Sequence, residues 1–247
     1  LFYAREFMRR FFVDPRSITA DTAHLSKTES QHIVSVLRLQ PGEAVELFDG
    51  KGKVYHGKLQ EISRNQVTVR LLSIQSENHE KSPPVFLLQS LLKGKKMDFL
   101  VQKSTELGVH TFQPLLTRYS ENRGNHVRQN ERWQRIMLEA CKQCKRTVPM
   151  LINPLVKFNE IDLGPFSTKL LLWEDETTQP LDPQQFVSNE PVCLLIGPEG
   201  GFHGDEIDHA RENGFQTVTL GSRILRAETA TLATVAIVQY LLGTLGK

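Results

Sequence analysis

Two glycine-rich segments in the last quarter of the chain hold the residues best suited to chemistry. The first reads IGPEGG over Ile196–Gly201 and contains one carboxylate, Glu199. The second reads LGSRILRAETA over Leu220–Ala230 and contains Arg226 and Glu228. Glycine tolerates positive φ and lets backbone N–H groups approach a ligand closely. Each segment is a candidate ligand-binding loop, and for either segment alone a tight turn without a ligand is the alternative.

Neither segment matches a phosphate-binding fingerprint. GPEGG lacks the G-x-G-x-x-G spacing of dinucleotide sites and the Gly-Lys-Ser/Thr of a P-loop. Glu199 adds negative charge where an anion would lie, so a cation, a ribose hydroxyl or an N–H donor is the better partner. Arg226 stands where a helix is expected to begin, and the helix macrodipole disfavours a cation there. A guanidinium fixed at this point grips a phosphate or stabilises developing negative charge, unless it braces the loops through a salt bridge with Glu199 or Glu228.

The elements that must position these loops are apolar strands that alternate with helices after residue 83. We expect strands at VFLLQSLL, TFQPLLT, KLLLW, VCLLI and QTVTL. We expect helices at about 97–107, 129–145, 205–213 and 227–242. This alternation predicts an α/β fold with a mostly parallel sheet that is covered on both faces. Ligands bind beyond the carboxyl ends of such strands, which is where Trp173-Glu174, GPEGG and LGSRILR all lie.

The first 80 residues have a different pattern of short strands and turns. Strands are expected at Phe11–Val13, in the hairpin AVELFDGKGKVYHGKLQEI and at QVTVRLLSI, with a short helix at about 29–39. Strands at this spacing predict a small β-barrel. The polar segment Glu77–Pro84 closes with two prolines and marks a linker. We therefore predict an N-terminal domain over 8–78 and a C-terminal domain over 83–247.

Charge is distributed unevenly along the chain, although its net charge is only +2. Residues 93–146 carry 12 Lys and Arg against 5 Asp and Glu, whereas residues 156–212 carry 3 against 12. The basic segment favours a polyanionic partner such as a nucleic acid. Two solvated faces of opposite charge are the alternative that charge alone leaves open.

Cysteine content and hydropathy bear on the compartment and on metal binding. The three cysteines are too few for a disulfide framework and are typical of a reducing compartment. Cys141-x-x-Cys144 has zinc spacing, but no second Cys or His pair follows it, so we expect two helix residues that face the core and no metal. The longest apolar stretch, TLATVAIVQYLLG, is too short to span a bilayer. We predict a cytoplasmic protein without membrane contact.

LLIGPEGGFHGDEI followed by LGSRILRAETATLATVAIV closely resembles the C-terminal signature of the bacterial ribosomal RNA small subunit methyltransferase E family. That family belongs to the SPOUT superfamily of knotted methyltransferases. MRRFFV and HIVSVLRLQPGE resemble its N-terminal barrel, and KGKKMDFLVQKSTELGV and RWQRIMLEACKQCKR resemble its middle motifs. The resemblance covers nearly the whole chain, and the order and spacing of the two glycine-rich segments make it highly specific.

The resemblance implies a fold, an activity and partners. The fold would be a PUA-like β-barrel that helps to bind RNA, followed by a SPOUT α/β domain with a deep trefoil knot. The activity would be S-adenosylmethionine-dependent methylation of N3 of one uridine at the decoding centre of 16S rRNA. The protein would prefer assembled 30S small subunits and form a homodimer. The nearly all-apolar helix 227–242 fits a dimer interface, and a fully buried core helix is the alternative.

The resemblance also implies which residues form the site. S-adenosylmethionine would contact residues from the three strand-end loops, namely Leu172, Trp173, Glu174, Ile196, Gly197, Glu199, Gly200, Leu220, Gly221, Ile224 and Leu225. Attack by uridine N3 on the methyl group requires loss of a proton or stabilisation of the resulting anion. Arg226 is the first catalytic candidate, for stabilising that anion or holding the uridine phosphate. Glu199 and Glu228 are candidate bases or orienting groups, and the sequence does not rank them.

Basic residues from both domains are expected to contact the rRNA backbone: Arg9, Arg10, Arg38, Lys93, Lys95, Lys96, Arg118, Arg123, Lys142, Lys145 and Arg146. A solvated surface charge is the alternative for each of them. Related sequences carry an Arg-Ser pair after the strand TFQPLLT, whereas this chain reads Arg118-Tyr119-Ser120. The inserted Tyr119 is a candidate for stacking on a base or for filling a gap.

Two other functions compete with this one. A non-catalytic ribosome-assembly factor that binds RNA could keep the fold, but such a protein would be free to lose the glycines of GPEGG and LGSRILRAETA. A SPOUT methyltransferase that acts on transfer RNA is the second alternative. The N-terminal barrel and its HIVSVLRLQPGE segment favour the ribosomal substrate over that one.

Overall fold

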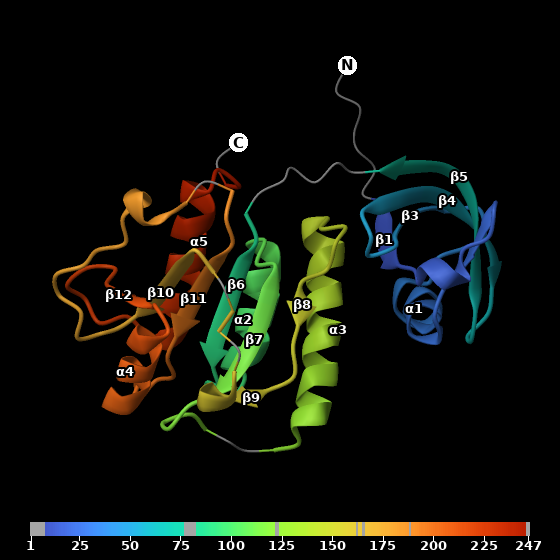
Figure 1. Cartoon of the computed structure of the whole chain (residues 1–247). Coiled ribbons are helices and arrows are strands. Elements are labelled where there is room, and N and C mark those ends of the chain that lie inside the picture. The colour runs from blue at the N-terminus through green and yellow to red at the C-terminus, as the bar shows by residue number, and fades with distance from the viewer. Residues whose placement is uncertain are drawn as a thin grey trace. The chain divides into compact units, whose positions relative to one another are not determined.

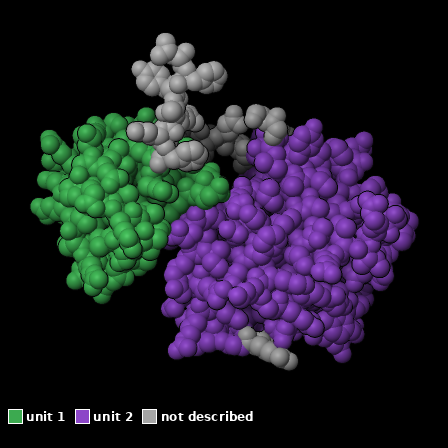
Figure 2. Space-filling model, turned by 180° about the vertical axis from the view of Figure 1, so that it is seen from behind, with its two compact units in different colours: residues 1–80, 141–149 green, residues 81–140, 150–247 purple. Residues whose placement is uncertain are grey.

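The structure is a computed structural model that describes residues 8–76, 83–121, 124–161, 163–164, 166–187 and 189–245. The chain forms two compact units, which Figure 2 colours green and purple. The first unit contains residues 1–80 and 141–149, and the second contains residues 81–140 and 150–247. The predicted domains, 8–78 and 83–247, differ from this division in the assignment of residues 141–149. The expected linker, Glu77–Pro84, lies mostly outside the described residues.

A five-stranded sheet forms most of the first unit, in the order β1-β3-β4-β5-β2. Its strands are β1 (Arg9–Phe12), β2 (Thr22–His24), β3 (Ala44–Phe48), β4 (Lys53–Ile62) and β5 (Val67–Ser76). β1 runs parallel to β3, and the other pairings are antiparallel. β4 and β5 contain register shifts and curve strongly, as Figure 1 shows. Asp49 closes the predicted hairpin turn by accepting the Lys51 N–H at 2.7 Å.

The helix expected at about 29–39 is shorter and less regular than the sequence pattern indicates. α1 covers only Lys27–Gln31, and the chain then widens into a π-helical turn over His32–Leu37. Arg38 ends this turn with a φ of 53°. The turn places Ile33 in the core of the sheet, so burial of this side chain rather than helical regularity determines the local conformation.

Residues 141–149 join the first unit through side-chain contacts. Lys142 Nζ lies 2.6 Å from Glu29 Oε1, and both side chains are about nine-tenths buried. Gly50 lies against the ring of Pro149, so that a Cβ at this glycine would stand 3.5 Å from Pro149 Cδ. The first unit is therefore discontinuous in sequence.

The second unit is built on a parallel sheet with the strand order β12-β10-β11-β6-β7-β8 (Figure 1). The short strand β9 also pairs with β7, further along that strand than β8 does. The strands are β6 (Val85–Ser90), β7 (Thr111–Leu116), β8 (Leu151–Ile152), β9 (Val156–Lys157), β10 (Thr168–Leu172), β11 (Val192–Ile196) and β12 (Gln216–Val218). The helices are α2 (Lys96–Glu106), α3 (His126–Cys144), whose residues from Cys141 onward belong to the first unit, α4 (Gly204–Glu212) and α5 (Ala227–Leu241). The predicted α/β fold with a mostly parallel sheet is confirmed.

The central strand β11 explains why the sheet needs cover on both faces. All five of its residues are buried, which accounts for the continuous apolar run VCLLI. Cys193 and Leu195 belong to one core cluster with Ile207 and Ala210 of α4. The intervening residues of β11 point to the other face of the sheet. α5 also contacts β11, and it packs against α2.

Three strands of this sheet end at the same level. Leu172, the last residue of β10, pairs with Ile196 at the end of β11 and with Val218 at the end of β12. The loops that follow these strands therefore begin side by side at one edge of the sheet. This register brings together three segments that are far apart in the sequence.

The loop that follows β10 lies across the exit of β12. The Thr219 N–H donates to the Gln179 carbonyl at 2.8 Å, and the Leu181 N–H donates to the Thr219 carbonyl at 3.2 Å. Between these bonds, Pro180 forms an isolated parallel bridge with Thr219. We call residues 173–181 the β10 loop. It meets the chain where it leaves β12 on its way to α5.

One carboxylate anchors the β10 loop to the sheet. Glu176 Oε2 accepts the hydroxyl of Thr217 on β12 at 2.7 Å, and Oε1 accepts the N–H and hydroxyl of Thr178 at 2.9 and 2.8 Å. The hydrogen bond from Thr217, together with those from Thr178 and the Gln179 N–H, lowers the pKa of Glu176 to about 2. The ionised carboxylate is therefore the form that the folded loop requires.

Replacing Glu176 by Gln should lower thermal stability at neutral pH, because the amide loses the charge that its donors favour. The pKa of Glu176 falls from an ordinary 4.5 to about 2 on folding, so its stabilisation is present above pH 4.5 and is lost as pH falls through about 2. The melting-temperature difference between wild type and Glu176→Gln should therefore shrink between pH 4.5 and pH 2. Glu190→Gln, at an exposed loop carboxylate, is the matched control. A difference that is constant with pH would contradict the assignment.

Candidate active site

A cavity of about 1080 Å³ lies at the edge where β10, β11 and β12 end. Its walls come from the β10 loop, from the turn Gly197–Gly201 and from residues 219–227 before and at the start of α5. The cavity is thus formed by the three segments whose strands end at the same level. Its size is at the upper end of the range for small-molecule sites, which is roughly 300–1,000 Å³.

Most residues predicted to contact a cofactor line this cavity. Ten of the eleven do so: Leu172, Trp173, Glu174, Ile196, Gly197, Glu199, Leu220, Gly221, Ile224 and Leu225. Arg226 also lines it, whereas Gly200 and Glu228 do not. The structure adds lining residues that the sequence motifs did not single out for this role: Lys96, Glu176, Thr177, Pro180, Leu181, Pro198, Gly201, Thr219, Ser222, Arg223, Ala227, Ala230 and Ile237.

The turn after β11 needs its last glycine for two reasons. Gly201 has a φ of 69°, and its N–H donates to the Pro198 carbonyl at 3.0 Å to close the turn. The carboxylate of Glu174 also packs directly on the Gly201 Cα, where a Cβ would clash. This glycine therefore lets the β10 loop and the turn after β11 approach closely enough to share one cavity.

Gly200 faces away from the cavity, toward the loop after β7. A Cβ on Gly200 would lie 3.0 Å from the Cβ of Tyr119. The Tyr119 ring stands edge-on to His203, with 6.1 Å between the ring centroids, and remains 49% exposed. The inserted tyrosine therefore packs against the turn after β11 and keeps part of its ring accessible to solvent.

A buried polar network, which the sequence analysis missed, connects two of the segments that line the cavity. Gln89 on β6 is fully buried, and its Oε1 accepts the Thr231 hydroxyl of α5 at 2.7 Å. Its Nε2 donates to the Ser90 carbonyl at 3.0 Å and, at 3.5 Å, to the carbonyl of Gly197. Gln89 thus connects the turn after β11 with the first turns of α5. The only sign of this network in the sequence is Gln89 itself, a side-chain amide within the apolar strand VFLLQSLL.

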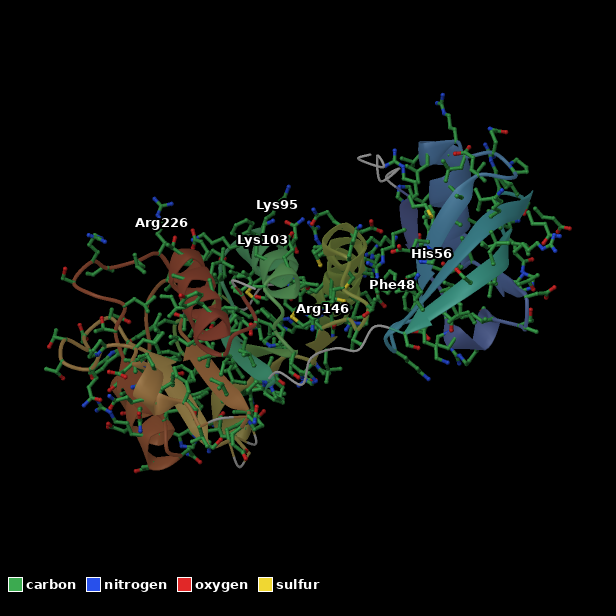
Figure 3. All side chains as sticks on the ribbon, turned by 90° about the horizontal axis from the view of Figure 1, so that it is seen from above. Phe48, His56, Lys95, Lys103, Arg146 and Arg226 are labelled. Atoms are coloured by element: carbon green, nitrogen blue, oxygen red, sulfur yellow. The ribbon has the colours of Figure 1, made fainter. Side chains whose placement is uncertain are left out.

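The ionic contacts of the site differ from the salt bridges considered as alternatives for Arg226. Lys96 Nζ lies 2.9 Å from Glu199 Oε1 and 3.1 Å from Glu228 Oε2. Arg226 is the N-cap residue of α5, and its side chain is exposed and extends away from the helix (Figure 3). Among the described residues, no hydrogen-bond or ion-pair partner of the Arg226 side chain is found. Its guanidinium is available to a ligand.

The basic residues predicted to contact RNA differ in their exposure and in whether a protein group already binds their side chain. Arg9, Arg38, Lys93, Lys95, Arg118 and Lys145 are exposed, although Arg118 donates to His203 Nε2 at 3.0 Å. Lys96 and Lys142 are held by carboxylates. Arg146 Nε donates to the Val148 carbonyl at 2.6 Å, and burial lowers the pKa of its guanidinium. Arg123 lies outside the described residues.

Arg10 is buried, in contrast to the surface position expected for an RNA contact. Its side chain is only 4% exposed, and its Nε lies 3.2 Å from Glu46 Oε1 on the neighbouring strand β3. Its guanidinium carbon stands 4.9 Å from the centre of the Phe48 ring. The pleat explains the difference, because Arg9 and Arg10 are successive residues of β1 and point to opposite faces.

The described residues also bear on metal and membrane binding. Within the described residues, no group of three or more His, Cys, Asp and Glu side chains is arranged to hold a metal ion. Cys141, Cys144 and Cys193 form no disulfide with one another, and Cys141 is buried in α3. No helix in the described part of the chain combines the length and apolar character needed to cross a membrane.

Comparison with known proteins identifies the family. The RNA methyltransferase domain model matches residues 79–239, and the RNA methyltransferase PUA domain model matches residues 25–72. Ribosomal RNA small subunit methyltransferase E from a Synechocystis species is 37% identical over 94% of this chain and 78% of its own length. The protein of that name from Buchnera aphidicola is 33% identical, with coverage of 90% and 91%.

A solved structure agrees with these matches. The crystal structure of ribosomal RNA small subunit methyltransferase E from Neisseria gonorrhoeae bound to S-adenosyl methionine superimposes with a TM-score of 0.84. It is 34% identical in sequence, and the match covers 95% of this chain and 98% of that one. The fold, the two domain models and the full-length relatives lead to one conclusion: this chain belongs to the ribosomal RNA small subunit methyltransferase E family.

Proposed function

We propose that this protein is an S-adenosylmethionine-dependent methyltransferase that modifies N3 of one uridine at the decoding centre of 16S rRNA. The observation that carries the proposal is the single cavity enclosed by three strand-end loops, within a chain that belongs to this methyltransferase family. The solved relative from Neisseria gonorrhoeae is bound to S-adenosyl methionine. The expected substrate is the 30S small subunit, because the relatives are named for small-subunit ribosomal RNA.

The residues of the cavity fit S-adenosylmethionine. Apolar side chains of Leu172, Ile196 and Leu225 offer surface for the adenine, and the glycine-containing turns offer main-chain groups that read its edge. Glu174 lines the cavity, and its carboxylate suits ribose hydroxyls or the ammonium group of the methionine moiety. S-adenosylmethionine, when bound, supplies a methyl group that its sulfonium has already made electrophilic.

The protein's part in the chemistry is alignment and charge. Arg226, whose side chain makes no hydrogen bond or ion pair with the described residues, is the group we assign to the uridine, either at its anionic base or at its phosphate. Burial alone would raise the pKa values of Glu199 and Glu228, but hydrogen bonds from Lys96 and backbone N–H groups lower both. A lowered pKa makes a carboxylate a weaker base, so we favour an orienting role for both.

We propose that the C-terminal part of this domain is threaded as a deep trefoil knot. The support is the β10 loop. Its residues Gln179 and Leu181 form hydrogen bonds with the N–H and the carbonyl of Thr219, respectively, where the chain leaves β12. β12 also pairs with β10 rather than with β11, so the chain returns past the loop that it has already formed. Such threading is rare among protein folds.

We propose a homodimer that uses the outer face of α5 and the loop before it. Ile224 is 86% exposed, and Ile237 and Tyr240 of α5 are 39% and 66% exposed. Ile237 and Tyr240 are three residues apart and so lie on one side of the helix. Large apolar side chains grouped in this way are typical of a contact surface.

The remaining expectations also stand as proposals. The PUA-like barrel over 8–78 and the catalytic domain over 83–247 would share the binding of RNA, and the enzyme would work in the cytoplasm without a metal. The free thiols are consistent with a reducing compartment. Exposed basic residues of both units, such as Arg9 and Lys95, would contact phosphates.

The two alternative functions are tested by binding and by substrate choice. Calorimetry with S-adenosylmethionine separates an enzyme from a non-catalytic assembly factor, and absence of binding at millimolar concentration would remove the methyltransferase assignment. Transfer of labelled methyl to purified 30S subunits rather than to transfer RNA is the expected outcome. Preferential labelling of transfer RNA would redirect the assignment to the other substrate.

Arg226→Ala should lower the rate constant of methyl transfer by about 100- to 1,000-fold, the range typical of losing one group that stabilises developing negative charge. The affinity for S-adenosylmethionine should change little if Arg226 faces the uridine. Single-turnover labelling of 30S subunits measures the first quantity and calorimetry the second. Arg135→Ala, an exposed arginine of α3, serves as the control. Near-normal turnover of Arg226→Ala would exclude this role.

Arg9→Met and Arg10→Met should have different effects, although the two residues are adjacent. Arg9 is exposed, so its loss should reduce the slope of log affinity against log salt for RNA by about one unit. Arg10 is buried beside Glu46 and Phe48, so its loss should lower the melting temperature and leave the slope unchanged. Filter binding at several salt concentrations and thermal unfolding distinguish the two effects. A reduced slope for Arg10→Met alone would reverse the assignment.

A further inference from the structure

Lys96 differs from the other lysines of its segment. It stands at the first residue of α2, and its side chain is 34% exposed between two carboxylates. Lys93 and Lys95 are exposed, and the described residues provide no ion-pair partner for either side chain. Figure 3 shows Lys95 extending away from α2. The sequence places all three in one basic stretch, but the structure separates Lys96 from it.

The two carboxylates offset the positive charge of Lys96, so that the cluster does not attract a phosphate. Glu199 Oε1 and Glu228 Oε2 lie within 2.9 and 3.1 Å of its Nζ. The three charges sum to −1, so a phosphate approaching this cluster would meet net repulsion. The hydrogen bonds that Lys96 donates to Glu199 and Glu228 raise its pKa, so the ammonium stays charged across the physiological range. An RNA contact is therefore a poor use of this lysine.

The partners of Lys96 come from two segments that the cavity needs in place. Glu199 belongs to the turn after β11, and its Oε1 also accepts the Lys93 backbone N–H at 3.2 Å. Glu228 lies in the first turn of α5, two residues after Arg226. One ammonium thus connects the start of α2, a wall of the cavity and the helix end that carries Arg226.

Removal of the ammonium would leave two partly buried carboxylates facing a shared space. Glu199 and Glu228 have side-chain exposures of only 24% and 19%, so solvent screens their repulsion incompletely. We expect the turn after β11 and the first turn of α5 to move apart, because this movement lowers the repulsion between the two carboxylates. That movement would open the cavity wall and displace Arg226.

We propose that Lys96 is a positioning residue of the cofactor cavity, which holds the Glu199 turn and the first turn of α5 in one arrangement and does not contact RNA phosphates. The inference rests on the proposed function, because it assigns the cavity to S-adenosylmethionine. It changes the role predicted for Lys96 from the sequence, and it makes Lys96 and Lys95 functionally different although they are neighbours.

The test compares Lys96→Met with Lys95→Met and with Lys96→Arg. Calorimetry with S-adenosylmethionine, without RNA, should show about tenfold weaker binding for Lys96→Met, the effect of losing one well-placed ionic contact. Lys95→Met should bind the cofactor as the wild type does, and Lys96→Arg should recover most of the affinity because guanidinium can bridge two carboxylates. The salt slope of RNA binding should fall for Lys95→Met and stay unchanged for Lys96→Met.

Each outcome decides one question. Wild-type cofactor affinity together with a reduced salt slope for Lys96→Met would overturn the inference and restore the phosphate contact. Failure of the wild-type protein to bind S-adenosylmethionine would instead overturn the proposed function. Should Lys96→Met not fold, Lys96→Gln, which retains a hydrogen-bond donor, carries the same comparison. Equal effects of Lys95→Met and Lys96→Met on cofactor affinity would also contradict the inference.

Discussion

The pairing of β10 with both β11 and β12 is the constraint on which the catalytic unit depends. β12 follows β11 in the chain but adds to the sheet on the far side of β10, so β10 becomes the centre of three parallel strands. Because their last residues are in register, the three following loops leave from one place. A cavity made in this way needs no charged phosphate motif. Its walls are the ends of strands whose positions the hydrophobic core already fixes.

The polar groups around the cavity connect the backbone segments that form its walls. Gln89 connects the turn after β11 with α5 from inside the sheet. Lys96 makes a second connection between the same two segments nearer to solvent. Glu176 connects the β10 loop to Thr217 of β12 in the same way. Arg226 differs from these residues, because its side chain is exposed and makes no hydrogen bond or ion pair with the described residues, which is why we propose it for the substrate.

Much of this architecture could be predicted from the sequence, for a physical reason. Strands such as VCLLI are buried on both faces, so their apolar runs are continuous and easily recognised. Glycine positions and helix starts located the loops of the site, and ten predicted contacts line one cavity. The strands β2, β8 and β9 were missed because they have only two or three residues each and lie in no apolar run like the QTVTL segment that contains the equally short β12.

What escaped prediction depends on partners that are distant in sequence. The positions of Arg10 and Lys142 follow from Glu46 and Glu29, and local charge gives no indication of either pairing. The same is true of Lys96, whose carboxylates lie more than a hundred residues away. The sequence therefore shows which residues are basic, but it cannot separate the exposed ones from those that are already paired with a carboxylate.

The discontinuity of the first unit has a consequence for biosynthesis. Its strands are complete by residue 76, yet Lys142 and Pro149, which contact Glu29 and Gly50, are translated more than sixty residues later. During synthesis the N-terminal strands therefore cannot form these contacts until the end of α3 has left the exit tunnel. The nascent chain cannot mature strictly from one end to the other, and the last steps of the two units are coupled in time.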